Sequence, residues 1–221
     1  MDLKFPILSK RAEKYRTEYT DKPDILIDVT DTAVLDLKLR GPHLTDAECE
    51  LMVSTSEFYK RLLNFNGFML HSSAVCVDNK AYLFSANSGT GKSTHTSLWL
   101  KLFGDKAFII NDDKPAIKIE NGKAYVYGTP WSGKSDLNRN VRVPLQGICL
   151  LERAEENFIE PLDKGTAIFK IMNQTLRPPL ESYMDKLLEL LDVVISDTPI
   201  WRMGCNISLE AAQMAYEAMS K

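Results

Sequence analysis

Short apolar runs separated by turn-forming residues fill the middle of the chain. FMLHSSAVCV (residues 68–77) and KAYLFSA flank Asp78-Asn79, and the runs within PAIKIENGKAYVYG flank Asn121-Gly122. Apolar runs joined by two residues that tolerate a left-handed backbone are typical of β-hairpins. AFIIN, which ends at Asp112-Asp113, and VPLQGICLLE (residues 143–152) predict two further buried strands. This pattern predicts a mixed, largely antiparallel sheet.

Helical spacing of apolar residues begins at residue 94. Leu98, Leu102 and Phe103 share one helical face, and Gly104 is a C-terminal stop signal. The C-terminal third is expected to be mainly helical, broken at Pro178-Pro179, with IWRMGC (residues 200–205) as one more strand. Strands followed by helices in this order predict an α/β fold.

The first 66 residues have a different pattern. ILIDVT (residues 25–30) and AVLDLKLR (residues 33–40) predict short strands from their alternation and β-branched content. Residues 46–65 predict an amphipathic helix that Thr45 caps, with Glu48 completing a capping box. We therefore expect an N-terminal α+β appendage over residues 1–66 and the main domain, which contains the predicted sheet, over residues 67–221.

Composition and charge remove several classes of protein. The chain has 221 residues, a formal net charge of −3 and 44% hydrophobic residues, which fits one domain with a small appendage. We expect neither nucleic acid nor membrane as a partner, because no strong positive charge and no apolar run of about 18 residues is present. The start lacks a signal-peptide core, and the four cysteines form no C-x-x-C pair, so a reducing cytoplasm is expected.

The second arm of the first hairpin runs directly into SANSGTGKSTHT, residues 85–96. Glycines at 89 and 91 let backbone N–H groups approach an anion, and a helix that begins near Lys92 presents its N-terminus to it. Lys92 is suited to β and γ phosphates, and the Ser93 hydroxyl to Mg²⁺. Residues expected to bind a nucleotide are Asn87, Ser88, Gly89, Thr90, Gly91, Lys92, Ser93 and Thr94. Ala86 occupies the position where this pattern has its first glycine, and an ordinary glycine-rich turn before a helix is the alternative.

Two adjacent carboxylates close the strand after the loop. At a strand end beside a phosphate site, one carboxylate suits a metal ion and the other a proton from the acceptor. We assign Asp113, with Ser93, to Mg²⁺ and Asp112 to the general base. The alternative is an Asx-type turn before Pro115. His71 lies on the strand expected to pair with the loop strand, which would bring it near the γ phosphate.

The segment GTPWSGKSDLNRNVRVP, residues 128–144, is too long for a tight turn and rich in cations. Its cations are suited to holding an acceptor or to stabilising charge on a transferring phosphoryl group. Lys134 is the first candidate, because Ser-Gly-Lys gives an anion access to the backbone, and Arg139 is the second. A solvated loop with surface cations is the alternative.

LHSSAV, SANSGTGKST and IINDD, at this spacing, resemble the catalytic domain of the bacterial HPr kinase/phosphorylase. More broadly, they resemble the fold that it shares with ATP-dependent phosphoenolpyruvate carboxykinase, whose members are much longer. The resemblance covers Phe68 to Glu152. The family loop reads Gly-x-Ser-Gly-x-Gly-Lys-Ser, so Ala86 replaces its first glycine, while its histidine falls on His71 and its aspartate pair on Asp112 and Asp113.

The resemblance implies a phosphate loop (P-loop) on a sheet unlike the Rossmann type. We expect a kinase that uses Mg²⁺ and ATP to phosphorylate a hydroxyl of a protein, peptide or small molecule. The related kinase is a hexamer, so a homo-oligomer is one open outcome, and the choice between ATP and GTP is open. A non-catalytic nucleotide sensor or partner-binding protein is the alternative, suggested by Ala86 and by the lack of the family's Glu-Arg pair within residues 143–152. A parallel-sheet phosphate-loop NTPase is a weaker alternative, because two hairpins are predicted.

Overall fold

The computed structural model describes residues 4–18 and 22–221. Its strands are β1 (Gly67–Met69), β2 (Ser72–Val77), β3 (Lys80–Ser85), β4 (Ala107–Asp113), β5 (Ala116–Glu120), β6 (Lys123–Tyr127), β7 (Arg142–Arg153), β8 (Phe158–Pro161) and β9 (Ile200–Cys205). Its α-helices are α1 (Pro6–Arg11), α2 (Asp31–Arg40), α3 (Asp46–Leu62), α4 (Lys92–Phe103), α5 (Lys164–Met172), α6 (Glu181–Asp197) and α7 (Leu209–Met219). Short 3₁₀ turns, η1 (Glu13–Tyr15), η2 (Leu63–Phe65) and η3 (Gly104–Lys106), connect some of them.

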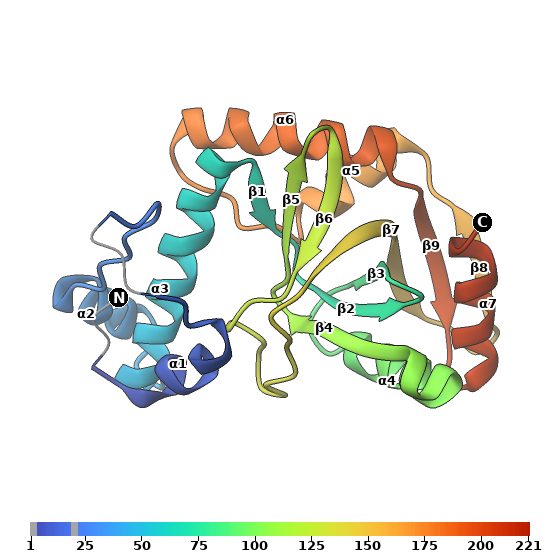
Figure 1. Ribbon diagram of the computed structural model, residues 1–221, viewed down its shortest axis with the longest axis horizontal. Coiled ribbons are helices and arrows are strands. Elements are labelled where there is room, and N and C mark those ends of the chain that lie inside the picture. Colours follow the sequence, from blue (N-terminus) through green and yellow to red (C-terminus); the bar gives the residue numbers. More distant parts are fainter. Residues whose placement is uncertain (1–3, 19–21) are drawn as a thin grey trace.

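The strands form one curled, mixed sheet in the order β1-β5-β6-β7-β3-β2-β4, to which β9 and β8 add beside β7 (Figure 1). The pairs β3–β7 and β7–β9 are parallel. The other pairs of the described sheet are antiparallel. The predicted α/β class and the largely antiparallel sheet are therefore confirmed. Both predicted hairpins are present, as β2–β3 and β5–β6.

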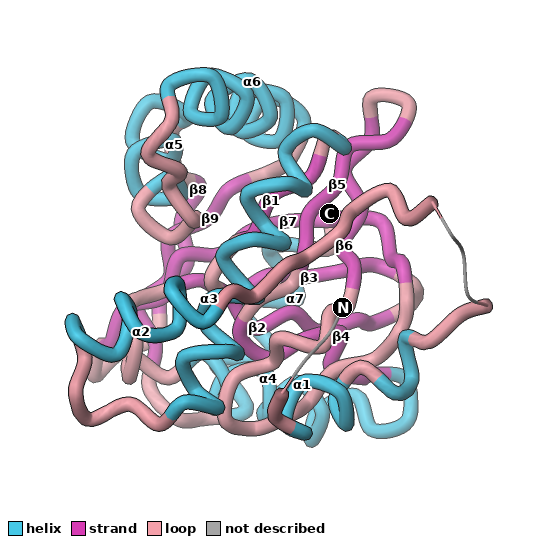
Figure 2. The backbone as a smooth tube through the Cα atoms, turned by 90° about the vertical axis from the view of Figure 1, so that its left-hand side faces the viewer, coloured by secondary structure: helices cyan, strands magenta, loops and turns pink. Residues whose placement is uncertain are grey.

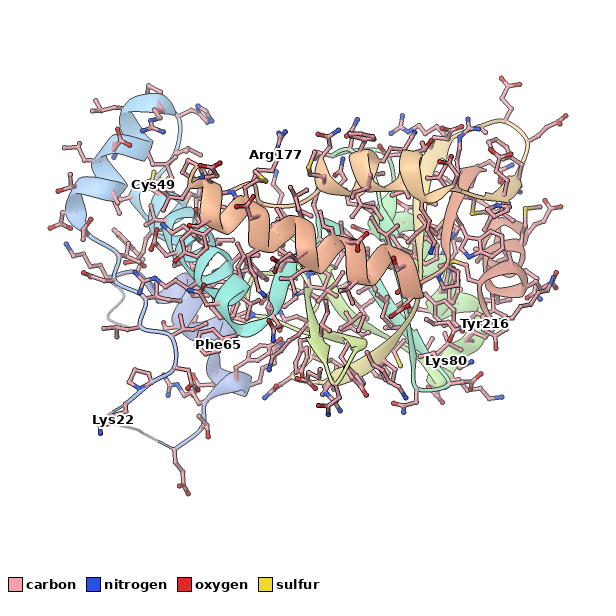
Figure 3. The ribbon with its side chains drawn as sticks, turned by 90° about the horizontal axis from the view of Figure 1, so that it is seen from above. Lys22, Cys49, Phe65, Lys80, Arg177 and Tyr216 are labelled. Atoms are coloured by element: carbon pink, nitrogen blue, oxygen red, sulfur yellow. The ribbon has the colours of Figure 1, made fainter. Side chains whose placement is uncertain are left out.

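Alternating side chains of the central strands enter two separate cores. Ala74 of β2 and Leu83 of β3 face one core together with α5 and α6. Val75 and Phe84, one residue further along, face the other core together with α4 and α7. Because strand side chains alternate between the faces of a sheet, continuous apolar runs are needed where helices cover both faces. Seen from above, α6 runs along the outside of its layer (Figure 3).

The N-terminal helices lie together at one side of the sheet, where α3 leads into β1 (Figure 1). From that side, α3 lies in front of the strands (Figure 2). Thr45 accepts a hydrogen bond from the Glu48 N–H, and the Glu48 carboxylate accepts one from the Thr45 N–H, so the predicted capping box is confirmed. A third cluster joins Tyr59 and Leu62 of α3 to Ala116 of β5 and to Trp131. The division at residue 66 stays a proposal.

Two predicted N-terminal strands are wrong. Residues 33–40 lie within α2, because Thr30 caps the helix and Asp36 pairs with Arg40 one turn later. Helical ion pairing and capping outweigh the short alternation that suggested a strand. Residues 25–30 lie in no helix or strand, although Ile27 is buried in the third cluster. The N-terminal part therefore has no strand among its described residues before Gly67.

The predicted strand 68–77 is two strands with different partners. β1 pairs with β5, whereas β2 pairs with β3 and β4. Leu70 bridges to Thr175 at the break. This break puts His71 at a corner of the sheet rather than within a strand. β8 was not predicted, because a four-residue edge strand gives too short a pattern.

Candidate functional site

A polar cavity of about 410 Å³ lies where the loop after β3 meets the end of β4. Its lining comes from the β1–β2 corner, the β3–α4 loop, β4 and the loop between β6 and β7. The lining residues are His71, Ser88, Gly89, Gly91, Lys92, Ser93, Thr94, Asp112, Asp113, Gly133, Lys134 and Ser135. Three separate predictions, for the glycine loop, the aspartate pair and the later cationic loop, thus meet in one place.

The glycine loop turns directly from β3 into α4. Gly91 is the N-cap of α4 with φ +123°, a backbone conformation that a residue with a Cβ rarely adopts. Ser93 and Thr94, in the first turn of the helix, are exposed. Ala86 is buried in the core beside α4. Its methyl group therefore packs inward, and the loop closes without a glycine at that position.

Lys92 lies back along its own loop. Its Nζ donates to the carbonyl oxygens of Ala86 at 2.9 Å and Asn87 at 3.4 Å, and the residue is 9% exposed. Burial lowers the pKa of Lys92, while Asp113 and Asp112 act to raise it. An ammonium held this way is ready to turn toward an anion in the cavity.

Arg153 holds the loop from outside. Its Nη2 donates to the Gly89 carbonyl at 2.6 Å and its Nε to the Thr90 carbonyl at 3.3 Å. Arg153 follows Glu152 in the sequence, so a Glu-Arg pair is present at the end of β7. The expectation that this pair is missing is therefore wrong, because the residue directly after the segment 143–152 is an arginine. The supposed lack of this pair therefore no longer favours the non-catalytic alternative, which Ala86 still leaves open.

The two carboxylates have different environments. Asp112 is 6% exposed, and its Oδ1 is buried with no hydrogen-bond partner among the described residues. Asp113 pairs with Lys114 and has its Oδ1 3.3 Å from Nε2 of His71. Burial alone would raise the pKa of Asp113, but His71 and Lys114 outweigh it and hold the pKa at about 2. Asp113 is therefore ionised at neutral pH. In Asp112, the Oδ1 atom is a hydrogen-bond acceptor without a donor among the described residues.

The turn after β4 is organised by Asn111 rather than by either aspartate. Its buried Oδ1 accepts from the N–H groups of Asp113 and Lys114 at 3.1 and 2.8 Å. Its Nδ2 donates to Thr129. An Asx-type turn is thus present, but it leaves both aspartate side chains in the cavity. Sequence reasoning missed Asn111, although its place directly before the aspartates was a signal.

The loop between β6 and β7 brings Lys134 to the cavity but not Arg139. The Arg139 guanidinium lies over the Phe108 ring, 4.5 Å from its centroid, and Arg139 is not among the lining residues. Asn87 and Thr90 also lie outside the lining, within the same glycine loop. We therefore remove Arg139 from the candidate catalytic residues.

The N-terminal segment fixes this loop from outside. Tyr15 donates to the Asn138 Oδ1 at 2.7 Å, and Lys14 to the Asn138 carbonyl at 2.7 Å. Arg11 pairs with Asp136 at 3.3 Å. The Trp131 ring stacks on Phe58 of α3 with centroids 4.6 Å apart. None of these contacts has a local sequence signal, since more than 70 residues separate the partners.

Gly133 lies directly against Asp113. It has φ +67°, and a Cβ there would be 2.9 Å from the Asp113 Cβ. We expect Gly133→Ala to move Asp113 or the loop and, if the cavity binds Mg-ATP, to weaken that binding several-fold. Gly122→Ala is the matched control, because Gly122 has φ +76° and nothing within 4 Å. Both variants carry a backbone cost of about 1–2 kcal/mol, visible in thermal unfolding. Equal loss of Mg-ATP affinity in both would contradict a role for the Asp113 contact.

The cavity fits a magnesium ion bound together with phosphates. Mg²⁺ usually takes one or two protein carboxylates and completes its shell with water and phosphate oxygens. The ionised carboxylate of Asp113 and the exposed hydroxyl of Ser93 would supply such oxygens. Among the described residues, no cluster of three or more His, Cys, Asp or Glu side chains forms a metal site.

Fold and cavity together define a mixed α/β protein with a polar site where a glycine loop faces paired carboxylates. The chain belongs to the family described as SynChlorMet cassette protein ScmC, whose family model matches residues 45–189, more than half of the chain. No curated protein matches it.

A solved structure, the Hpr(Ser) kinase/phosphatase from Coxiella burnetii, is similar at a TM-score of 0.40 and 10% identity. The match covers 68% of this chain and 95% of that one. This is a distant structural likeness. No helix among the described residues is long and apolar enough to cross a membrane.

Proposed function

We propose that this protein is an ATP-dependent kinase that transfers the γ-phosphoryl group to a hydroxyl of a protein, a peptide or a small molecule. The observation that carries the proposal is one cavity in which the start of α4, the buried Lys92 and the carboxylates of Asp112 and Asp113 meet. Phosphoryl transfer depends mainly on positioning and on stabilising charge, and these are the groups it requires.

The glycine loop and α4 would bind the phosphates. The backbone N–H groups from Ser88 to Lys92, which lead into the N-terminus of α4, would donate hydrogen bonds to the anion. The Lys92 ammonium would leave the Ala86 carbonyl and bind the β and γ phosphates. Arg153 binds the Gly89 and Thr90 carbonyls of the loop, which would keep these oxygens away from the phosphates. The anion would then meet the backbone N–H donors of the loop rather than its carbonyl oxygens.

Asp113 and the exposed Ser93 would hold Mg²⁺. A bound Mg²⁺ neutralises charge on the β and γ phosphates. The Asp113 carboxylate is ready to bind a cation, because its pKa of about 2 keeps it ionised across the physiological range. His71 orients that carboxylate from one side and Lys114 from the other.

Asp112 would accept the proton of the acceptor hydroxyl. As the acceptor oxygen bonds to the γ phosphorus, the bond from that phosphorus to the bridging oxygen breaks, and ADP leaves with the electron pair. Lys134, which also lines the cavity, would stabilise the transferring group or hold the acceptor. Four free cysteines support a reducing compartment, and we place the protein in the cytoplasm.

Titration calorimetry tests the nucleotide site. We expect Mg-ATP to bind, ATP with EDTA to bind more weakly, and adenosine to give no measurable heat, because the lining residues offer polar and charged groups and include no large apolar side chain on which a base could stack. Failure of Mg-ATP to bind would overturn the proposal. Binding without any ATP hydrolysis or transfer would favour the non-catalytic sensor instead.

A further inference from the structure

Gln174 joins two parts of the candidate site, the His71 corner and the glycine loop, by hydrogen bonds of its side chain. It lies between α5 and α6, on the same connection as Arg177, which projects outward in Figure 3. Its Nε2 donates to the Asn87 Oδ1 at 3.0 Å. Its Oε1 lies 3.1 Å from Nδ1 of His71. The opposite ring nitrogen of His71, Nε2, lies 3.3 Å from the Asp113 Oδ1. One side chain thus connects the glycine loop, through His71, to the ionised carboxylate.

The backbone of Gln174 is anchored to the same corner of the sheet as its partner. The Gln174 carbonyl accepts from the His71 N–H at 2.8 Å, and its own N–H donates to the Ile171 carbonyl at 2.8 Å. The next residue, Thr175, bridges to Leu70. His71 is therefore bound to Gln174 by main chain and side chain alike, so the position of one determines that of the other.

A side-chain amide suits this place because it has a donor and an acceptor on one rigid plane. A carboxylate at position 174 would lack the donor for Asn87, and an ammonium would lack the acceptor for His71. The contact also limits rotation of the His71 ring, since turning it by half a turn would remove Nδ1 from the amide oxygen. Positioning groups of this kind hold a site in its working geometry.

We propose that Gln174 is a positioning residue that fixes the His71 ring against Asp113 and couples it to Asn87 of the glycine loop. Its effect on nucleotide affinity rests on the function proposed above, whereas its effect on the His71 ring does not. A nucleotide bound at the loop would therefore be affected by the orientation of His71, although His71 lies on a different strand connection.

The first test is independent of nucleotide. The chain has only three histidines, so the ring nitrogen signals of His71 are readily assigned by NMR. Gln174→Met keeps the length of the side chain and removes both hydrogen bonds. We expect it to shift the His71 ring signals and leave those of His43 and His95 in place. Gln213→Met, which removes an exposed contact to Glu217, is the matched control. An unchanged His71 signal in Gln174→Met would overturn the inference.

The second test is a double-mutant cycle on Mg-ATP affinity with His71→Phe and Asn87→Ala. In the wild-type background, we expect the loss of Mg-ATP affinity in the double variant to differ by about threefold or more from the product of the two single losses. In the Gln174→Met background, the loss in the double variant should equal that product to within about twofold. A merely structural role would change unfolding temperature but not this coupling. Equal coupling in both backgrounds would overturn the link. If the wild type binds no Mg-ATP, the proposed function fails, and the NMR result alone decides the role of Gln174.

Discussion

Lys92→Met is expected to weaken Mg-ATP binding by about 10- to 150-fold, the range of one charge-assisted hydrogen bond. The rate of ATP hydrolysis should fall by about 10³-fold or more relative to the wild type, because the ammonium also stabilises the negative charge on the transferring phosphoryl group. The unfolding temperature should stay the same or rise. Lys92 is buried and its pKa is lowered by burial, so the folded state gains little from its charge in the absence of phosphate.

Methionine is chosen because it keeps the apolar stem of the lysine and removes the ammonium group, with its charge and its two hydrogen bonds to the loop carbonyls. Lys101→Met is the matched control, because Lys101 lies on the same helix, α4, and is exposed. Calorimetry gives the affinities and a phosphate-release assay gives the rates. If Lys92→Met bound Mg-ATP as tightly as Lys101→Met, the phosphate-binding role of the loop would be refuted.

Asp112→Asn should have opposite effects on activity and stability. We expect basal ATP hydrolysis, with water as the acceptor, to fall by about 10²- to 10⁴-fold, the usual contribution of a general base. Without ligand, the variant should unfold at a higher temperature, because Asp112 buries a carboxylate oxygen that has no hydrogen-bond partner among the described residues, and an amide costs less to bury than a carboxylate. Saturating Mg-ATP should raise the unfolding temperature of both proteins, because the substitution leaves the phosphate loop intact.

The neighbouring Asp113→Asn provides a contrast. Asp113 has its pKa lowered from 3.8 to about 2, so the folded state favours its ionised form. That preference contributes about 2 kcal/mol above pH 4 and is lost as the pH falls from about 4 to 2. Asp113→Asn should therefore destabilise the protein at neutral pH and weaken the magnesium dependence of nucleotide binding.

If Asp112→Asn kept the wild-type rate of ATP hydrolysis, Asp112 would not be the general base.

Local sequence signals predicted much of the fold. The turns at Asp78-Asn79 and Asn121-Gly122 and the capping box at Thr45 depend on residues within a few positions of each other, and all three are present. The strand predicted over residues 33–40 failed because four alternating apolar residues also fit a capped helix. Short segments of this kind are decided by their surroundings.

The candidate site was predictable only in part, for a similar reason. Lys92, Asp112 and Asp113 stand in patterns that indicate their chemistry, and the structure brings them into one cavity. Gln174 and Arg153 contact the glycine loop from 87 and more than 60 positions away, and nothing in their local sequence indicates this. Arg139 looked functional because cations are common near phosphates, yet its neighbour Phe108 holds it elsewhere.

The contacts of Arg11, Lys14 and Tyr15 with the β6–β7 loop have a consequence for exchanging parts between related chains. A hybrid that takes its first 66 residues from one relative and the remainder from another would place a foreign surface against Trp131 and Asn138. In a hybrid chain, residues 1–66 and 128–141 should therefore be taken from the same relative. A hybrid made in this way keeps both sides of the aromatic and polar contacts matched, and Lys134 keeps its place at the cavity.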